Sequence, residues 1–305
     1  MVFVPGLELT RALREQGIDR SEIRTLLGAG DLVRVRRGAY ARNPTKDLAT
    51  THRREVAAAL AACSDVWVSH TSAALLHGLP FWPGDLAAVH LTKSRSTGGR
   101  RRAGVHVHVQ PVPSPDAAVI DGHPVTSLAR TVADCLRMLD FEHAVMLGDG
   151  AMRKGLDADE LQRVLSAASG RTGSGRARVA ALFLDGRAES EGESRSRAVL
   201  ARGGIPVPEL QFIVRDRRGT VVARTDFGWP QLRTIGEFDG MVKYGRLVPA
   251  GDAPGDVVFR EKIREDMLRD LGWQVVRWTW SELDHPAVIY ERLHRAFVRG
   301  RTQAA

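Results

Sequence analysis

The spacing of hydrophobic and polar positions changes along the chain, and these changes predict which segments are helices and which are strands. In residues 7–16 the apolar side chains fall on one helical face. A second short helix is predicted over 21–27, with Asp19 or Ser21 able to cap its first amides. Residues 32–41 then alternate apolar and basic side chains on both sides of a turn, which predicts a β-hairpin.

The middle of the chain mixes helical and strand spacing. Its predicted helices are 51–62, 70–77, 127–139, 144–154 and 157–168, and its predicted strands are 66–68, 89–93 and 105–109. A basic, glycine-rich loop is expected over 97–104. This region is therefore expected to be α/β.

The carboxy-terminal third predicts a second α/β arrangement with a mixed sheet. Its elements run in the order helix, strand, strand, strand, helix, strand, helix, over 187–201, 210–215, 221–227, 233–238, 261–271, 274–280 and 286–299. A chain of 305 residues suggests two domains and permits three. Breaks in composition at Pro44 and at the glycine- and serine-rich run 169–175 divide the chain into 1–43, 44–168, a linker over 169–186, and 187–305.

Composition excludes several classes of protein. No stretch approaches the roughly 20 uncharged apolar residues of a membrane span. The first residues lack the pattern of a secretory signal, so a cytoplasmic protein is expected. Cys63 and Cys135 are the only cysteines, which excludes a disulfide framework and a cysteine-ligated zinc site.

The charge balance favours a polyanionic partner. The formal net charge is +8 and the sequence pI is about 10.1. Two helices followed by a hairpin predict a winged helix-turn-helix in residues 1–43. Its second helix would present Arg20 and Arg24 to a DNA groove, and its hairpin would neutralise phosphates with Arg34, Arg36 and Arg37. The alternative is a solvated basic hairpin on a small packing domain.

The first two-thirds of the chain resembles the AbiEi-type antitoxin family. The resemblance is carried by residues 21–24, 30–40, 69–78 and 125–134. It implies transcriptional autoregulation within a type IV toxin–antitoxin system and a cognate toxin as a partner.

Acidic side chains in the carboxy-terminal third predict a divalent-cation site. Asp226 and Glu237 lie on two successive predicted strands, and Glu193 lies on the helix before them. Oxygen ligands of this kind suit Mg²⁺, which would polarise a phosphodiester and activate water. The alternative is that Arg224 or Arg277 neutralises Asp226.

The same third resembles the PD-(D/E)XK nuclease superfamily, in its branch similar to very-short-patch-repair endonucleases. The matching segments are 193–197, 208–211, 224–230, 237–244, 261–262 and 271–280. The resemblance implies a restriction-endonuclease-like fold, with Asp226, Glu237 and Glu193 as catalytic and Mg²⁺-binding residues. The family's usual lysine position holds Asp239; Lys243 is a candidate to supply the ammonium group, and Gln211 is a candidate to line the site.

The histidines of the middle region are candidate metal ligands: His70, His77, His90, His106, His108 and His123. His106 and His108 share one strand face, but no carboxylate or cysteine lies at ligand spacing beside them, so no metal is expected there. The leading hypothesis is therefore an antitoxin-like DNA-binding regulator joined to a Mg²⁺-dependent, nuclease-like domain. The rival hypothesis is a non-catalytic regulator whose last domain only binds DNA or a partner.

Overall fold

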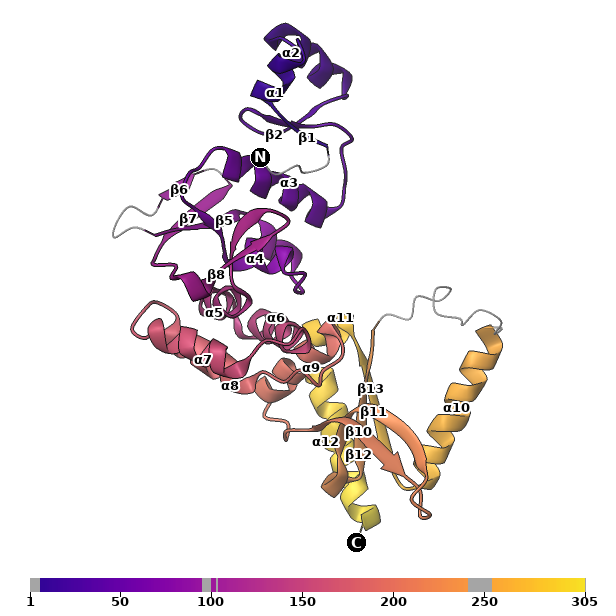
Figure 1. The fold of residues 1–305 in the computed structure, drawn as a ribbon. Helices are drawn as coiled ribbons and strands as arrows, with labels where there is room; N and C mark the ends of the chain where they lie inside the picture. The colour runs from indigo at the N-terminus through magenta and orange to yellow at the C-terminus, as the bar shows by residue number, and fades with distance from the viewer. Residues whose placement is uncertain (1–5, 95–99, 103, 241–253, 305) are drawn as a thin grey trace. The chain divides into compact units, whose positions relative to one another are not determined.

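The protein is described by a computed structural model that covers residues 6–94, 100–102, 104–240 and 254–304. Within these residues it contains twelve α-helices and three β-sheets (Figure 1). The chain divides after Leu182 into an amino-terminal and a carboxy-terminal unit. The division falls inside 169–186, the expected linker, although much of that segment forms helix α8 (Ser174–Phe183).

The amino-terminal unit begins with two helices and a small antiparallel sheet in the order β1-β3-β2. The elements are β1 (Leu7–Leu9), α1 (Thr10–Glu15), α2 (Arg20–Ala29), β2 (Val33–Arg36) and β3 (Ala39–Ala41). The prediction of helix from residue 7 is wrong for three residues. Leu7 pairs with Ala41 and Leu9 with Ala39, so pairing with β3 overrides the local helical spacing.

Capping and a small core hold this part together. Asp19, rather than Ser21, caps α2, because its carboxylate accepts hydrogen bonds from the amides of Ser21 and Glu22 at 2.7 and 2.9 Å. The core consists of the buried side chains Leu13, Ile23, Leu32 and Tyr40.

The rest of this unit is built on a six-stranded mixed sheet in the order β6-β7-β5-β4-β9-β8. Its strands are β4 (Trp67–Val68), β5 (Val89–Lys93), β6 (Arg100–Arg102), β7 (Val105–Val109), β8 (Ala117–Ile120) and β9 (His123–Thr126). The helices are α3 (Leu48–Ala61), α4 (His70–Leu76), α5 (Leu128–Met138), α6 (Phe141–Arg153) and α7 (Ala158–Ala167). The sequence did not predict β8 and β9, and β6 occupies part of the expected loop 97–104, whose residues 97–99 and 103 lie outside the described residues.

The carboxy-terminal unit follows the expected order of elements, with one addition: a short helix that begins at Trp280, the residue expected to end the last strand. A four-stranded sheet runs β10-β11-β12-β13, antiparallel except for the parallel pair β12 and β13, so the sheet is mixed. The elements are α9 (Glu191–Arg202), β10 (Glu209–Arg215), β11 (Val221–Trp229), β12 (Thr234–Asp239), α10 (Pro254–Asp270), β13 (Gln274–Thr279), α11 (Trp280–Asp284) and α12 (Ala287–Ala304).

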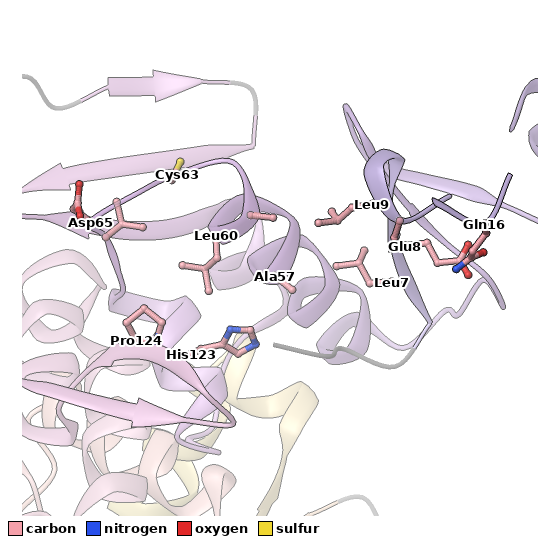
Figure 2. Close-up of a pocket in the computed structure, with 13 residues that line it drawn as sticks. Leu7, Glu8, Leu9, Gln16, Ala57, Leu60, Cys63, Asp65, His123 and Pro124 are labelled. Carbon is pink, nitrogen blue, oxygen red and sulfur yellow. The ribbon is translucent and has the colours of Figure 1, made fainter. Parts of the chain in front are cut away.

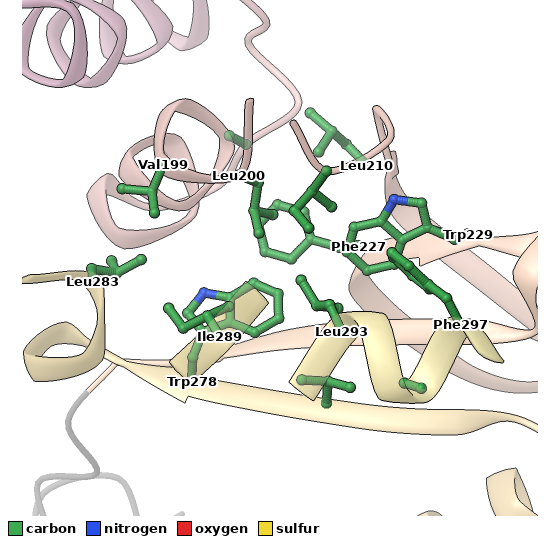
Figure 3. Close-up of a cluster of buried hydrophobic side chains, with 14 residues drawn as sticks. Val199, Leu200, Leu210, Phe227, Trp229, Trp278, Leu283, Ile289, Leu293 and Phe297 are labelled. Carbon is green, nitrogen blue, oxygen red and sulfur yellow. The ribbon is translucent and has the colours of Figure 1, made fainter. Parts of the chain in front are cut away.

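Two apolar clusters stabilise this unit. The larger includes Phe227, Trp278, Ile289 and Leu293 and joins the sheet to α9, α11 and α12 (Figure 3). The smaller includes Ile235 and Trp273 and receives Leu268 from α10. Trp273 and Trp278 serve packing, because they are only 6% and 1% exposed. No described helix has the length and apolar character needed to cross a membrane.

Two glycines allow the closest approaches around the sheet. A Cβ atom built on Gly192, in the first turn of α9, would lie 1.9 Å from the Phe238 ring. A Cβ atom built on Gly236 of β12 would lie 2.5 Å from the Trp278 ring. Both glycines therefore set the distance between an aromatic ring and the backbone that it covers.

We expect the substitution Gly192→Ala to lower the free energy of unfolding of the protein by about 1–3 kcal/mol, because the methyl group would overlap the Phe238 ring. Gly175→Ala is the matched control, since a Cβ atom there meets nothing within 4 Å. Chemical denaturation of both variants measures the effect; equal stabilities would contradict the close approach.

Candidate functional site

The acidic residues predicted from the sequence lie in one region of the carboxy-terminal unit. Glu193 is in the first turn of α9, Asp226 is on β11 and Glu237 is on β12. The pairing of Phe227 with Gly236 places Asp226 and Glu237 opposite each other, one step further along the two strands. The topology of the sheet therefore brings Asp226 and Glu237 together, and α9 carries Glu193 to the same sheet, where it bonds Gln211 of β10.

Glu193 is fixed by a network of hydrogen bonds and is only 8% exposed. Its Oε1 accepts a hydrogen bond from the Ser190 hydroxyl at 2.8 Å, and its Oε2 accepts one from the Glu189 amide at 2.8 Å. Ser190 in turn caps α9 by accepting the amide of Glu193 at 3.1 Å. These bonds hold a buried carboxylate at the helix N-terminus, where negative charge is favoured.

Gln211 joins this network from β10. Its Nε2 donates to Glu193 Oε2 at 2.9 Å. Its neighbours Leu210 and Phe212 each pair with a residue of β11, one on either side of Asp226. Gln211 therefore lies opposite Asp226. Its φ of 52° is in the left-handed region, which a non-glycine residue adopts only when its surroundings impose it. The expectation that Gln211 lines the site thus has support in the hydrogen bond to Glu193.

Asp226 is half-buried and is the most electrostatically perturbed of the three. Burial raises its pKa to about 6, and the carboxylates of Glu193, Glu237 and Glu189 act in the same direction. The amide of Phe238 donates to Oδ2 at 2.7 Å and partly opposes this shift in pKa. Within the described residues, no donor reaches Oδ1.

Glu237 is held by two arginines. Arg264 of α10 lies 2.8 Å from Oε1, and Arg277 of β13 lies 2.9 Å from Oε2. Arg277 thus pairs with Glu237 rather than with Asp226. The other candidate, Arg224, pairs with Glu189 through two bonds of 2.9 Å. Neither arginine considered as a partner for Asp226 is bonded to it.

The three carboxylates do not form a compact set of ligands around one point. Three side chains that share an ion should have ligand atoms within about 4.8 Å of one another. Among the described residues, Glu193, Asp226 and Glu237 do not form such a group. Glu193 and Asp226 nevertheless offer hard oxygen atoms beside an amide side chain. Carboxylate oxygens are the kind of ligand that Mg²⁺ prefers. Lys243 lies outside the described residues, and Asp239 is half-buried at the end of β12.

The basic residues predicted to contact DNA lie on α2 and the β2–β3 hairpin. Arg20 and Arg24 are exposed one turn apart on α2. Arg34 and Arg37 are exposed on the hairpin, and the Arg34 guanidinium lies 5.9 Å from the centre of the Tyr40 ring. Arg36 is half-buried and donates to the Gly104 carbonyl at 3.4 Å.

An apolar cavity of about 470 Å³ lies in the amino-terminal unit. Leu7 and Leu9 of β1 line one side, and Leu60, His123 and Pro124 line the other (Figure 2). The rest of its lining is mostly apolar, and its ionisable side chains are Glu8, Cys63, Asp65 and His123.

Sequence reasoning missed a group of buried polar residues in the amino-terminal unit. Arg130 and Asp134 of α5 form a buried ion pair at 2.9 Å, and Arg130 also binds Asp116 at 3.0 Å. His70, His90 and His108 lie together on one face of the six-stranded sheet. The strand face carrying His108 was noted in the sequence, but nothing in the spacing showed that α4 brings His70 to it.

Comparison with known proteins gives relatives but no family description. No protein-family model matches the chain. Two proteins of Mycobacterium tuberculosis are each 30% identical to this chain over 263 residues. They are "Uncharacterized protein MT2308" of strain CDC 1551 and "Uncharacterized protein Rv2248" of strain H37Rv. Each alignment covers 84% of this chain and 89% of the relative. A crystal structure of the RV2827C protein from M. tuberculosis aligns with a TM-score of 0.40 at 17% identity, over 71% of this chain and 86% of that one.

The raised pKa of Asp226 predicts a pH-dependent stability of the metal-free protein. A carboxyl in the unfolded chain titrates near 3.9, so between about pH 4 and pH 6 the folded state binds more protons. The contribution of Asp226 to the free energy of unfolding therefore falls as pH rises through that window and stays low above it. At pH 8 in EDTA, we expect Asp226→Asn to be more stable than the wild type by about 1–2 kcal/mol.

Denaturant melts at pH 4.5 and pH 8 measure this difference, with the exposed residue Asp270 changed to Asn as the matched control. A variant that is less stable than the wild type at pH 8, and equal to it at pH 4.5, would show that the carboxylate is stabilised rather than destabilised by its surroundings.

Proposed function

The chain belongs to the same protein family as Rv2248 of Mycobacterium tuberculosis, and we propose that it is a DNA-binding regulator with a Mg²⁺-dependent, nuclease-like carboxy-terminal unit. Family membership assigns no activity, because the relatives' names carry none. The proposal rests on the arrangement of side chains in each unit. The half-buried carboxylate of Asp226, whose pKa is raised to about 6 by burial and by the charges of Glu193, Glu237 and Glu189, is the single observation that supports a cation site most strongly.

The amino-terminal part supports a winged helix-turn-helix. Helices α1 and α2 are followed by the β2–β3 hairpin, and a buried cluster around Leu13 and Ile23 fixes their packing. In such a fold the second helix enters the major groove, which would place Arg20 and Arg24 against the DNA. Arg34 and Arg37 on the exposed hairpin would then neutralise phosphates.

The carboxy-terminal unit supports a PD-(D/E)XK-like arrangement. A helix glutamate, a strand aspartate and a glutamate on the next strand occur in the order that the resemblance implies. Mg²⁺ at Glu193 and Asp226 would supply Lewis acidity to a phosphodiester. Gln211 orients Glu193, the Phe238 amide orients Asp226, and Arg264 and Arg277 provide positive charge next to Glu237.

A second candidate function is favoured by a specific observation. Glu237 is neutralised by Arg264 and Arg277, and Asp239 occupies the position where lysine is usual. Both features suit a non-catalytic regulator that retains the nuclease-like fold for binding DNA or a partner. Under either candidate, the resemblance to antitoxins proposes a cognate toxin as the partner, and an adjacent nucleotidyltransferase reading frame would support that role.

The cation site predicts a specific pattern of cleavage. With supercoiled plasmid and Mg²⁺, we expect Asp226→Asn and Glu193→Gln to reduce nicking by at least about 100-fold, because each removes an oxygen ligand. Glu291→Gln is the matched control, since its pair with Arg295 lies on the exposed face of α12. Equal nicking by all four proteins would assign the activity to a contaminant. An absence of nicking in the presence of tight DNA binding would favour the non-catalytic candidate.

The basic hairpin predicts a salt-dependent affinity for duplex DNA. We expect Arg34→Ala and Arg37→Ala each to weaken binding and to reduce the slope of log K against log salt by about 1, because each loses one phosphate contact. Fluorescence anisotropy with a labelled duplex measures both quantities. Arg178→Ala, an exposed arginine on α8, is the control and should leave the slope unchanged. An unchanged slope for the hairpin variants would contradict the proposed interface.

A further inference from the structure

A cluster of imidazoles lies on one face of the six-stranded sheet. Parallel strands β5 and β7 pair His90 with His106 and Thr92 with His108, so these four side chains share that face. Helix α4 begins at His70, whose ring stacks on that of His108 with centroids 3.7 Å apart and an angle of 14° between the planes. Two strands and one helix therefore place their imidazoles together.

Three of these rings approach closely enough to share an ion. One nitrogen atom from each of His70, His90 and His108 lies within 4.8 Å of the other two, the one such group of three found in the described part of the chain. His90 Nδ1 and His108 Nε2 are 2.8 Å apart. Around a tetrahedral Zn²⁺ with bonds of about 2.0–2.1 Å, neighbouring nitrogens are about 3.3 Å apart, so small side-chain movements suffice.

Neighbouring hydroxyl groups fix the residues that carry these rings. His70 Nδ1 lies 3.0 Å from the Ser69 hydroxyl, which leaves Nε2 as the nitrogen directed elsewhere. The Ser72 hydroxyl accepts the backbone amide of His90 at 2.8 Å. Such supporting contacts around metal-binding histidines set the orientation of the ring.

Two further features set this cluster apart from ordinary packing. His70 has a φ of 50°, a left-handed conformation that is strained for a non-glycine residue and is concentrated at functional positions. The Thr92 hydroxyl, opposite His108, is fully buried and has no hydrogen-bond partner among the residues that the structure describes. A buried polar atom without a partner, on the same face as three imidazoles, indicates that a polar ligand belongs there.

We propose that His70, His90 and His108 bind one Zn²⁺ ion, with the Thr92 hydroxyl group available to the fourth position directly or through a water molecule. Imidazole nitrogen is a preferred ligand of Zn²⁺ and a poor one of Mg²⁺, so this site is distinct from the carboxylate site of the other unit. His70 and His90 are 5% and 8% exposed, whereas His108 is more accessible and gives the ion a route in. The proposal revises the sequence-based expectation that these histidines hold no metal, because the spacing did not show that α4 brings His70 next to His90 and His108.

Untagged, full-length protein stripped with EDTA tests the site. Titration with Co²⁺, as a spectroscopic probe for Zn²⁺, should give one equivalent of tetrahedral visible bands, and Zn²⁺ should displace the Co²⁺ and raise the melting temperature. We expect His70→Ala and His90→Gln each to weaken Co²⁺ binding by more than about 100-fold. Ser69→Ala, which removes only the contact to His70, should weaken it by about tenfold.

His123→Gln is the matched control, because His123 is a buried histidine of the same sheet outside the cluster. It should keep one equivalent and the wild-type spectrum. Circular dichroism shows whether each variant is folded. If a histidine variant does not fold, Ser69→Ala still tests the site, because it keeps all three ligands. Wild-type protein without tetrahedral Co²⁺ bands, or Co²⁺ bound equally by folded His70→Ala and wild type, overturns the proposal.

Discussion

The close approach of helix α9 to strand β12 is the constraint on which the carboxy-terminal unit depends. Gly192 has no side chain, so the Phe238 ring packs directly on the first turn of the helix, and Gly236 admits the Trp278 ring in the same way. The residue after Gly192 is Glu193, and the residue before Phe238 is Glu237. Apolar packing thus brings carboxylates together that would repel one another in an extended chain.

The three carboxylates differ in the partners that compensate their negative charge. Glu193 is stabilised by hydrogen bonds from Ser190, Glu189 and Gln211, and Glu237 by two guanidinium groups. Among the residues that the structure describes, the Phe238 amide is the donor to Asp226, and burial still raises the pKa of this carboxyl to about 6. The charges of Glu193 and Glu237 are therefore better compensated than that of Asp226. A bound cation would relieve the most electrostatic repulsion at Asp226.

Local spacing predicted most of the carboxy-terminal unit because its helices and strands have strong periodic patterns and clear turn residues. The helix containing Glu193 and the strands containing Asp226 and Glu237 were placed within a few residues of their observed bounds. Spacing could not show that Arg264 and Arg277 would hold Glu237, because these contacts join residues far apart in the chain. The strand β1 was missed for the same reason: its pairing with β3 depends on residues thirty or more positions away. His70 likewise joins His90 and His108 only through the packing of α4 on the sheet.

The hydrogen bond from Arg36 to the Gly104 carbonyl links the basic hairpin to the residue that precedes β7. The same carbonyl accepts the amide of Val89 at 3.0 Å, so one backbone oxygen joins the basic hairpin to the starts of both β5 and β7. If the proposed DNA contact drew the Arg36 guanidinium away, the bond from Val89 would still hold this oxygen. The hairpin can therefore exchange its partner while the edge of the strands keeps its backbone hydrogen bond.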